Sequence, residues 1–259
     1  MEEDILDFNK ALIELTQIAD SYSFDVWIPS KNKTVKFNEI TALQQKDILT
    51  GSMDSSIYSK KFNSALYEII KNNSSEDISE FTILDKILIC LQLREKVSNI
   101  IKIQQKDDKI DVDISPVIAE FKKNYTHPKE TVLSHNNIFI TIYPSYILEE
   151  KDYDETILKD NKKAEDIKNT DDIQEVISNA FIGELAKSIK KLKINDQHID
   201  MLPLTFKQRI RLVEKMPASL IQEILNVVSE WKKNVDDFLT IQKENESYTI
   251  KIDPLFFIG

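Results

Sequence analysis

Glycine is scarce in this chain, and this scarcity limits the folds open to it more than any other feature of the sequence. Only 3 glycines and 7 prolines occur among the 259 residues. Tight left-handed turns favour glycine, so architectures with many short strands and turns, such as propellers and sandwiches, are disfavoured. A glycine-rich phosphate loop is disfavoured for the same reason. The sequence therefore predicts a helix-rich fold.

Amphipathic patterns predict three helices in the first hundred residues. Residues 3–20 carry apolar side chains three and four positions apart, which predicts a helix with one apolar seam. The seam consists of Ile5, Phe8, Leu12, Leu15 and Ala19. Residues 55–71 repeat such a pattern, and residues 82–96 form the most apolar predicted helix. The apolar arc of this last helix is wide enough for it to be central to a core.

The stretch "DVWIPSKNKTVKFNEIT" (25–41) predicts a β-hairpin followed by a helix cap. Val26 and Ile28 precede the polar turn, and Val35 and Phe37 follow it. Such alternation on both sides of a turn is typical of a hairpin, here over residues 24–38. Thr41 and Gln44, three residues apart, then predict a capping box at the start of a short helix.

Further strand patterns occur before residue 150. "NIIKIQQ" and "DKIDVDI" are separated by charged residues, and "ETVLSH" and "NIFITIYP" are joined at Asn136. Pro116 suits the first turn of a short helix between these two pairs. The first 150 residues are therefore predicted to form an α+β domain.

The chain changes character at residues 149–175, which are dense in charges of both signs and poor in apolar residues. We interpret residues 151–175 as a charged linker or flexible excursion. Residues 176–259 are predicted to be a helical region. One helix seam comprises Ile177, Phe181, Leu185, Ile189 and Leu192, and a later one comprises Ile221, Ile224, Val228, Trp231, Val235 and Phe238. The ending "SYTIKIDPLFF" predicts a terminal strand and an aromatic tail.

Charge and cysteine content restrict the classes of function. The net charge is −10, so the surface repels phosphate backbones and nucleic acid is not predicted as a partner. Cys90 is the only cysteine, which leaves no internal disulfide and no cysteine-based zinc site. The start "MEEDILDFNK" lacks the features of a secretory signal, and no apolar stretch approaches the roughly 18 residues of a membrane span. We expect a protein kept in a cytoplasm-like compartment.

No arrangement of reactive residues predicts catalysis. The sequence has no nucleophile elbow, phosphate loop or dinucleotide fingerprint. Cys90 falls within an apolar helix, where a thiol stays protonated. His127 and His135 do not have a standard metal-ligand spacing, and we interpret them, with His198, as surface or loop histidines.

One pair of acidic residues leaves an alternative open. Asp111 and Asp113 alternate along a predicted strand, so their carboxylates share one face and could hold magnesium for a metal-dependent hydrolase. The other interpretation is a half-buried strand, with Ile110, Val112 and Ile114 packed inward. The strand interpretation accounts for the same alternation without a metal.

Basic residues gather in two later segments, "SIKKLKIN" (188–195) and "FKQRIRLVEK" (206–215). Their cationic side chains are those of Lys190, Lys191, Lys193, Lys207, Arg209 and Arg211. They could meet phosphates or an acidic partner. Aromatic residues between them are nearly absent, which favours a solvated helix face instead.

The features of the sequence that do point to a function are packing surfaces and aromatic residues. Such features are typical of a subunit of a larger assembly. The candidate partner contacts are Trp27, Pro29, Ser30, Trp231, Phe256 and Phe257.

The order of short motifs resembles the baseplate hub subunits, or hub assembly proteins, of T-even-like contractile-tailed bacteriophages. The matching elements are Ile28-Pro29-Ser30, Val35-Lys36-Phe37, Thr41 through Leu49, Asp85, Arg94, "MLPLTFKQRI" (201–210) and the pair Phe256 and Phe257. The resemblance is colinear over most of the chain and lies in the arrangement of the motifs.

This resemblance implies a non-enzymatic structural or assembly role in a phage tail baseplate, with no cofactor and no metal. The implied partners are other tail and baseplate proteins in a multi-subunit complex, with no membrane contact. The implied location is the virion tail baseplate, assembled in the host cytoplasm. An assembly chaperone for hub or tape-measure proteins is the close alternative, and the hydrolase with Asp111 and Asp113 is the distant one.

Overall fold

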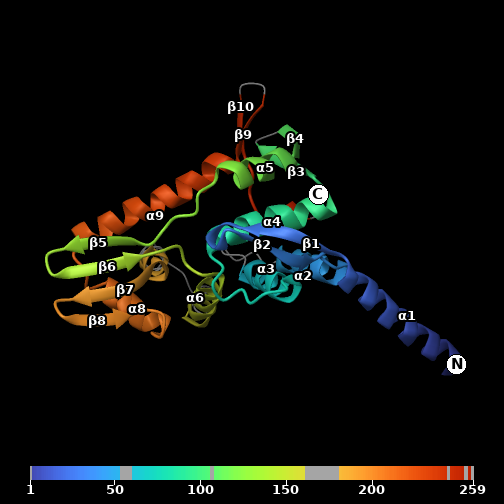
Figure 1. Cartoon of the computed structure of the whole chain (residues 1–259), viewed down its shortest axis with the longest axis horizontal. Coiled ribbons are helices and arrows are strands. Elements are labelled where there is room, and N and C mark those ends of the chain that lie inside the picture. Colours follow the sequence, from blue (N-terminus) through green and yellow to red (C-terminus); the bar gives the residue numbers. More distant parts are fainter. Residues whose placement is uncertain are drawn as a thin grey trace, which may run out of the picture. The chain divides into compact units, whose positions relative to one another are not determined.

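The computed structural model describes residues 2–52, 60–105, 108–160, 181–243, 246–253 and 256–257. The chain divides into two compact units. Unit 1 contains Met1–Ile78, Asp85–Tyr125 and Ile241–Gly259, and unit 2 contains Ser79–Leu84 and Thr126–Thr240. The helix-rich α+β class predicted from the sequence is confirmed (Figure 1). Among the described residues, no helix is long and apolar enough to span a membrane.

The described part of unit 1 consists of helices and three two-stranded hairpins. Its elements are α1 (Glu2–Ser21), β1 (Ser23–Ile28), the 3-10 turn η1 (Pro29–Lys31), β2 (Lys33–Asn38), α2 (Ala42–Ser52), α3 (Lys60–Asn73), α4 (Ile83–Val97, in unit 1 from Asp85), β3 (Ile100–Gln105), β4 (Asp108–Asp113), α5 (Ser115–Asn124), β9 (Thr240–Lys243, in unit 1 from Ile241) and β10 (Glu246–Thr249). The strand pairs are β1–β2, β3–β4 and β9–β10.

The predicted hairpin is confirmed as β1–β2. Val26 pairs with Val35, and both side chains are buried together with those of Ile28 and Phe37. Asn32 turns the chain with a φ of 47°, a left-handed conformation that asparagine tolerates. The short helix that follows, α2, begins with the predicted capping box. Thr41 N–H donates to Gln44 Oε1 at 2.9 Å, and Gln44 N–H donates to Thr41 Oγ1 at 3.2 Å.

Helix α4 lies at the centre of the unit 1 core, as its sequence predicts. Leu88, Ile89, Cys90 and Leu91 are all fully buried. Four consecutive buried residues cover the whole circumference of a helix, so α4 is surrounded on every side at this point. The thiol of Cys90 is therefore part of the core.

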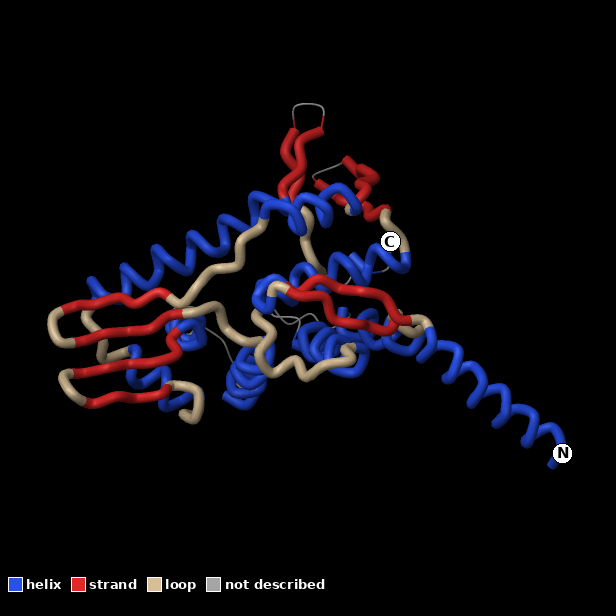
Figure 2. Tube along the Cα trace, viewed as in Figure 1, coloured by secondary structure: helices blue, strands red, loops and turns tan. Residues whose placement is uncertain are grey.

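Unit 2 contains a four-stranded antiparallel sheet in the order β5–β6–β7–β8, and Figure 2 shows its strands side by side. Its elements are β5 (Thr131–His135), β6 (Ile138–Ile142), α6 (Ile147–Asp160), β7 (Ile189–Ile194), β8 (Gln197–Asp200), α8 (Phe206–Val213) and α9 (Ala218–Leu239). Residues 181–188 are also helical. Asn136 and Asn195 form the β5–β6 and β7–β8 turns, each with a positive φ.

The predicted helix through Ile177, Phe181, Leu185, Ile189 and Leu192 is wrong in its second half, and Ile177 lies outside the described residues. The chain leaves the helix after Ser188 and continues as β7. A β-bulge in the pairing with β6, between Thr141 and Ile142, shifts the register. The shift allows Ile189 and Leu192 to be buried together although they are three residues apart. A bulged strand thus reproduces the spacing of a helix. The final third of the chain therefore contains strands β7 to β10 as well as helices.

The two units divide the chain differently from the predicted ranges of 1–150, 151–175 and 176–259. The last residues, from Ile241, belong to unit 1 with the first 78. Helix α6 continues to Asp160, ten residues into the segment predicted as a linker, and the side chain of Tyr153 is buried. Residues 161–175, the rest of that predicted linker, lie outside the described residues.

Candidate functional site

The predicted contact residues of the first hairpin are bound to helix α4. The N–H of Trp27 donates to Gln92 Oε1 at 3.0 Å, and the N–H of Ser30 donates to Asp85 Oδ1 at 2.9 Å. Pro29 is buried, whereas Trp27 and Ser30 are half-buried. The hairpin is therefore held against the core helix by its backbone.

The aromatic tail is anchored to the same helix. Arg94, itself buried, donates from Nε to the carbonyl of Phe256 at 2.7 Å. Its Nη1 and Nη2 donate to the carbonyls of Ser98 at 2.7 Å and Ile100 at 2.8 Å. Phe256 and Phe257 are buried and pack edge to face, with ring centroids 5.1 Å apart. Arg94 thus fixes Phe256 within unit 1.

Trp231 has a comparable internal role in unit 2. It is buried on α9 with Ile224 and Val235, and the other predicted seam residues are half-buried. The side chains of Trp231, Pro29, Phe256 and Phe257 are therefore used within the chain's own units. Contact with a partner through any of the six predicted residues stays a prediction.

The acidic pair on β4 is exposed. Asp113 Oδ1 accepts hydrogen bonds from Ser115 N–H at 2.9 Å and Asn99 Nδ2 at 3.2 Å, at the start of α5. Val112 and Ile114 are buried, as a half-buried strand requires. The described part of the chain contains no group of three or more histidine, cysteine, aspartate or glutamate side chains placed to hold a metal ion.

The sequence did not predict a buried cluster of charges in unit 2. Glu149 on α6 accepts hydrogen bonds from Lys190 Nζ on β7 and, at 2.6 Å, from Arg209 Nη1 on α8. All three side chains are buried. The sequence pattern favoured a solvated helix face for the basic residues, and for Lys190 and Arg209 this prediction is wrong. Both side chains are buried, and Lys190 lies on a strand.

Other hydrogen bonds of this cluster join it to backbone groups. Glu149 also accepts the N–H of Tyr146 at 2.8 Å, and Lys190 donates to the carbonyl of Lys187 at 2.8 Å. Arg209 donates to the carbonyls of Leu202 at 2.9 Å and Leu204 at 3.1 Å. The charges are thus paired and hydrogen-bonded, which is how buried ions are tolerated. We interpret the cluster as a structural tie between α6, β7 and α8.

Burial changes the proton affinity of two groups in and beside this cluster. Burial lowers the pKa of Lys190 to about 8, even though the charge of Glu149 opposes the shift. Burial also raises the pKa of the Tyr146 phenol, and the charge of Glu149 adds to that effect. The ammonium of Lys190 lies 4.6 Å from the centre of the Tyr146 ring.

The three histidines lie at separate places in unit 2. His127 Nε2 lies 3.0 Å from Thr82 Oγ1, His135 is on β5 with its Nε2 3.4 Å from Ser219 Oγ, and His198 is exposed on β8. Thr82 is buried and His127 is half-buried. None of these contacts is a metal-ligand arrangement.

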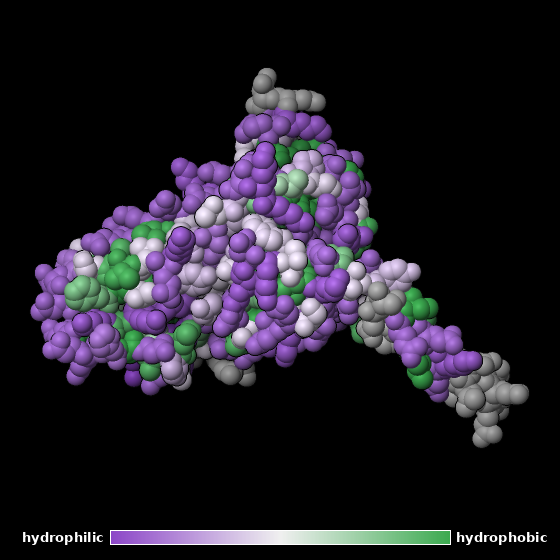
Figure 3. Space-filling view, viewed as in Figure 1, coloured by the Kyte–Doolittle hydropathy of each residue, from purple (hydrophilic) through white to green (hydrophobic). Residues whose placement is uncertain are grey.

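The clearest candidate surface is helix α1, which was absent from the predicted contacts. The helix is present as the sequence predicts, but the seam residues whose side chains the structure describes, Phe8, Leu12 and Leu15, are exposed to solvent. Phe8 and Leu15 are each 65% exposed, and Leu12 is 48% exposed. Figure 3 shows this apolar surface along α1 among polar side chains. The seam was visible in the sequence, but its spacing does not reveal whether another element of the chain covers it.

We compared the chain with known protein families, curated proteins and solved structures. No family model, curated protein or solved structure matches the chain.

Proposed function

We propose that this chain is a non-enzymatic structural or assembly component of a contractile phage tail baseplate, acting through protein–protein contacts. The exposed apolar seam of α1 is the observation that carries the proposal. The resemblance of the sequence to baseplate hub proteins is the reason for proposing a phage tail baseplate as the assembly. The location that follows is the tail baseplate, assembled in the host cytoplasm.

Helix α1 has the properties of a docking helix. Amphipathic helices commonly bind by laying an apolar face in a groove of a partner. Burial of a large apolar side chain contributes about 1.5–3 kcal/mol. Phe8, Leu12 and Leu15 together therefore offer several kcal/mol to a partner that covers them.

The rest of unit 1 forms a well-packed scaffold for this helix. Hydrogen bonds from Gln92 and Arg94 join the β1–β2 hairpin and the aromatic tail to α4. A contact surface on a preorganised scaffold loses less conformational freedom on binding.

A metal-dependent hydrolase is the competing class. The carboxylate of Asp113 already accepts two hydrogen bonds at the start of α5, and Asp111 is exposed on β4. Calorimetric titration with Mg²⁺, with the Asp111→Asn/Asp113→Asn variant as control, decides this point. Binding heat that the variant loses would favour the hydrolase.

Mass spectrometry of purified virions tests the proposed function. A structural subunit is expected in the tail fraction at a fixed ratio to other baseplate proteins. A chaperone is expected in assembly intermediates and not in mature virions. Its absence from both fractions contradicts the proposal.

A further inference from the structure

The four-stranded sheet of unit 2 has one buried face and one exposed face. Ile140 and Leu192, which pair across β6 and β7, are buried. The strand register places two rows of side chains on the opposite face. The rows are Ser134, Phe139, Lys193 and His198, and Val132, Thr141, Lys191 and Asp200. We call these eight residues the outer sheet face.

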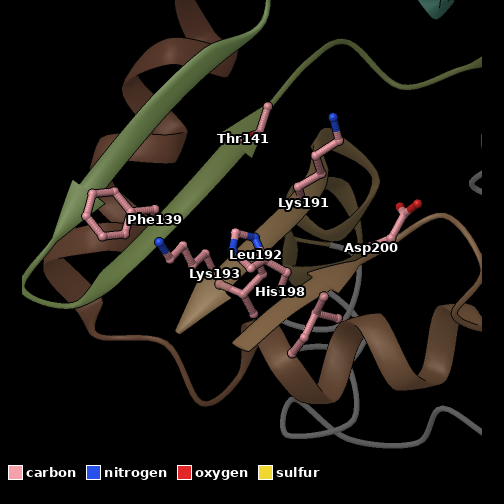
Figure 4. A pocket seen from close by; sticks show the side chains of 8 residues that line it. Phe139, Thr141, Lys191, Leu192, Lys193, His198 and Asp200 are labelled. Atoms are coloured by element: carbon pink, nitrogen blue, oxygen red, sulfur yellow. The ribbon is translucent and has the colours of Figure 1, made fainter. Parts of the chain in front are cut away.

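The outer sheet face is apolar at one edge and basic in its middle. Val132 is 62% exposed and Phe139 is 42% exposed. Lys193 Nζ lies 5.7 Å from the centre of the Phe139 ring, and Lys191 is exposed on the same strand (Figure 4). The single carboxylate, that of Asp200, accepts the N–H of Leu202 at 3.1 Å. This chemistry suits a ligand with apolar side chains and negative charge.

A hollow of about 380 Å³ opens on this face. Phe139, Lys191 and His198 contribute to its lining. Its size is at the lower end of the range for binding pockets, about 300–1,000 Å³, and it suits one or two large side chains.

Helix α1 has the complementary chemistry. Residues 2–21 contain six acidic residues and one lysine, a formal charge of −5. The same helix exposes Phe8 and Leu15.

We propose that α1 of one copy docks on the outer sheet face of a second copy. Apolar side chains of α1 cover Phe139 and Val132, and the acidic residues of the helix meet Lys191 and Lys193. The contact is heterologous because two different surfaces meet, so it builds rings or growing chains. This inference rests on the proposed role of α1 as a contact helix, and it names a second copy as its partner.

Sedimentation velocity of the full chain, over a wide range of concentration at low salt, gives the first measurement. The expected mass rises above the 30.1 kDa of one copy as concentration increases. It falls again with added salt because salt screens the attraction between lysines and carboxylates. A single copy at every concentration overturns the proposal.

Two variants remove the contact from opposite sides. Phe8→Asp/Leu15→Asp disrupts the helix seam, and Lys191→Glu/Lys193→Glu reverses the charge of the sheet. We expect each variant to raise the dissociation constant about tenfold or more, because the first loses apolar burial and the second replaces attraction with repulsion. If either variant associates as the wild type does, the proposal is wrong.

Two control variants carry changes of the same kind at exposed positions outside both surfaces, one apolar-to-aspartate substitution and one pair of charge reversals. Leu43→Asp places a charge on α2, where Leu43 is 66% exposed. Lys232→Glu/Lys233→Glu reverses two exposed charges on α9. Both controls are expected to associate like the wild type.

Mixing the two disrupted variants provides the decisive test. Each retains the surface that the other has lost, so an equimolar mixture is expected to form a complex of two copies. A variant that fails to fold cannot give this result. A mixture that stays monomeric overturns the proposal, and so does an unchanged association of either variant alone. These experiments use the purified chain only, so self-association can fail while tail incorporation, tested separately in virions, still holds.

Discussion

Gln92 closes the outer edge of strand β1 at Trp27. The N–H of Trp27 donates to Gln92 Oε1 at 3.0 Å, and Gln92 Nε2 donates to the carbonyl of Trp27 at 3.2 Å. Because β1 pairs with no described strand except β2, this side-chain amide takes the place of a neighbouring strand. Two backbone groups that would otherwise lack a partner are thereby satisfied inside unit 1.

Replacement of Gln92 by leucine is expected to lower the free energy of unfolding by about 2–3 kcal/mol, since both backbone groups of Trp27 lose their partner. Gln92→Glu keeps both an O–H donor and an acceptor when its carboxyl is protonated, so its loss should be smaller at low pH than at neutral pH, where a buried carboxylate would face the carbonyls of Trp27 and Leu88. Urea unfolding of the three proteins measures the difference. Equal stability of the wild type and Gln92→Leu would show that the amide is dispensable.

Arg94 is expected to contribute more than Gln92 because one buried guanidinium binds three carbonyls. Arg94→Met should destabilise the chain by about 3–4 kcal/mol, and Arg94→Lys should recover only part of this, because an ammonium lacks the fork of donors. Lys123→Met, an exposed change on α5, serves as the control. Chemical denaturation that leaves Arg94→Met as stable as Lys123→Met contradicts this role.

Glu149→Gln tests the buried charge cluster of unit 2. The variant leaves Lys190 and Arg209 buried without a counter-charge, so we expect a loss of about 3–5 kcal/mol in unfolding free energy. Addition of Lys190→Met to this variant should restore part of the loss, because one unpaired charge is removed. Glu214→Gln, exposed in the same unit, should cost much less. If the two glutamine variants have the same melting temperature, the cluster is not a structural tie.

The lowered pKa of Lys190 predicts a pH dependence of stability. The folded pKa is about 8, below the value of about 10.4 for an unfolded lysine. Between these values the unfolded chain binds more protons, so the contribution of Lys190 to stability increases with pH, by at most about 1.4 kcal/mol per pH unit. Below pH 8 both states are protonated, and this dependence disappears.

The difference in unfolding free energy between the wild type and Lys190→Met isolates this effect from other titrating groups. We expect the difference to move in favour of the wild type as the pH rises from 8 to 10. A difference that stays flat, or moves in favour of the variant, contradicts the lowered pKa.

Local patterns of the sequence predicted the local structure well. The hairpin at 24–38, the cap at Thr41 and the buried helix around Cys90 each depend on residues close together in the chain. Strand β7 was missed because its bulge gives Ile189 and Leu192 the spacing of a helix. That bulge depends on pairing with β6, which lies about 50 residues earlier in the sequence.

The charge cluster could not be predicted for a related reason. Glu149 is 41 residues from Lys190 and 60 residues from Arg209. Lysine and arginine are mostly exposed, so a basic segment alone predicts a solvated surface. The seam of α1 shows the opposite error. Its apolar spacing predicts burial, but in the fold Phe8, Leu12 and Leu15 are exposed.

The amount of this chain in purified phage tails, measured for the wild type and for Phe8→Asp/Leu15→Asp, tests the central claim most directly. We predict that the wild-type chain is present at a constant ratio to the other baseplate proteins. The variant, altered only on the exposed face of α1, should be folded but depleted from tails and assembly intermediates. Equal incorporation of the two proteins would contradict the role of α1, and absence of the wild-type chain from tails and intermediates would contradict the proposed function.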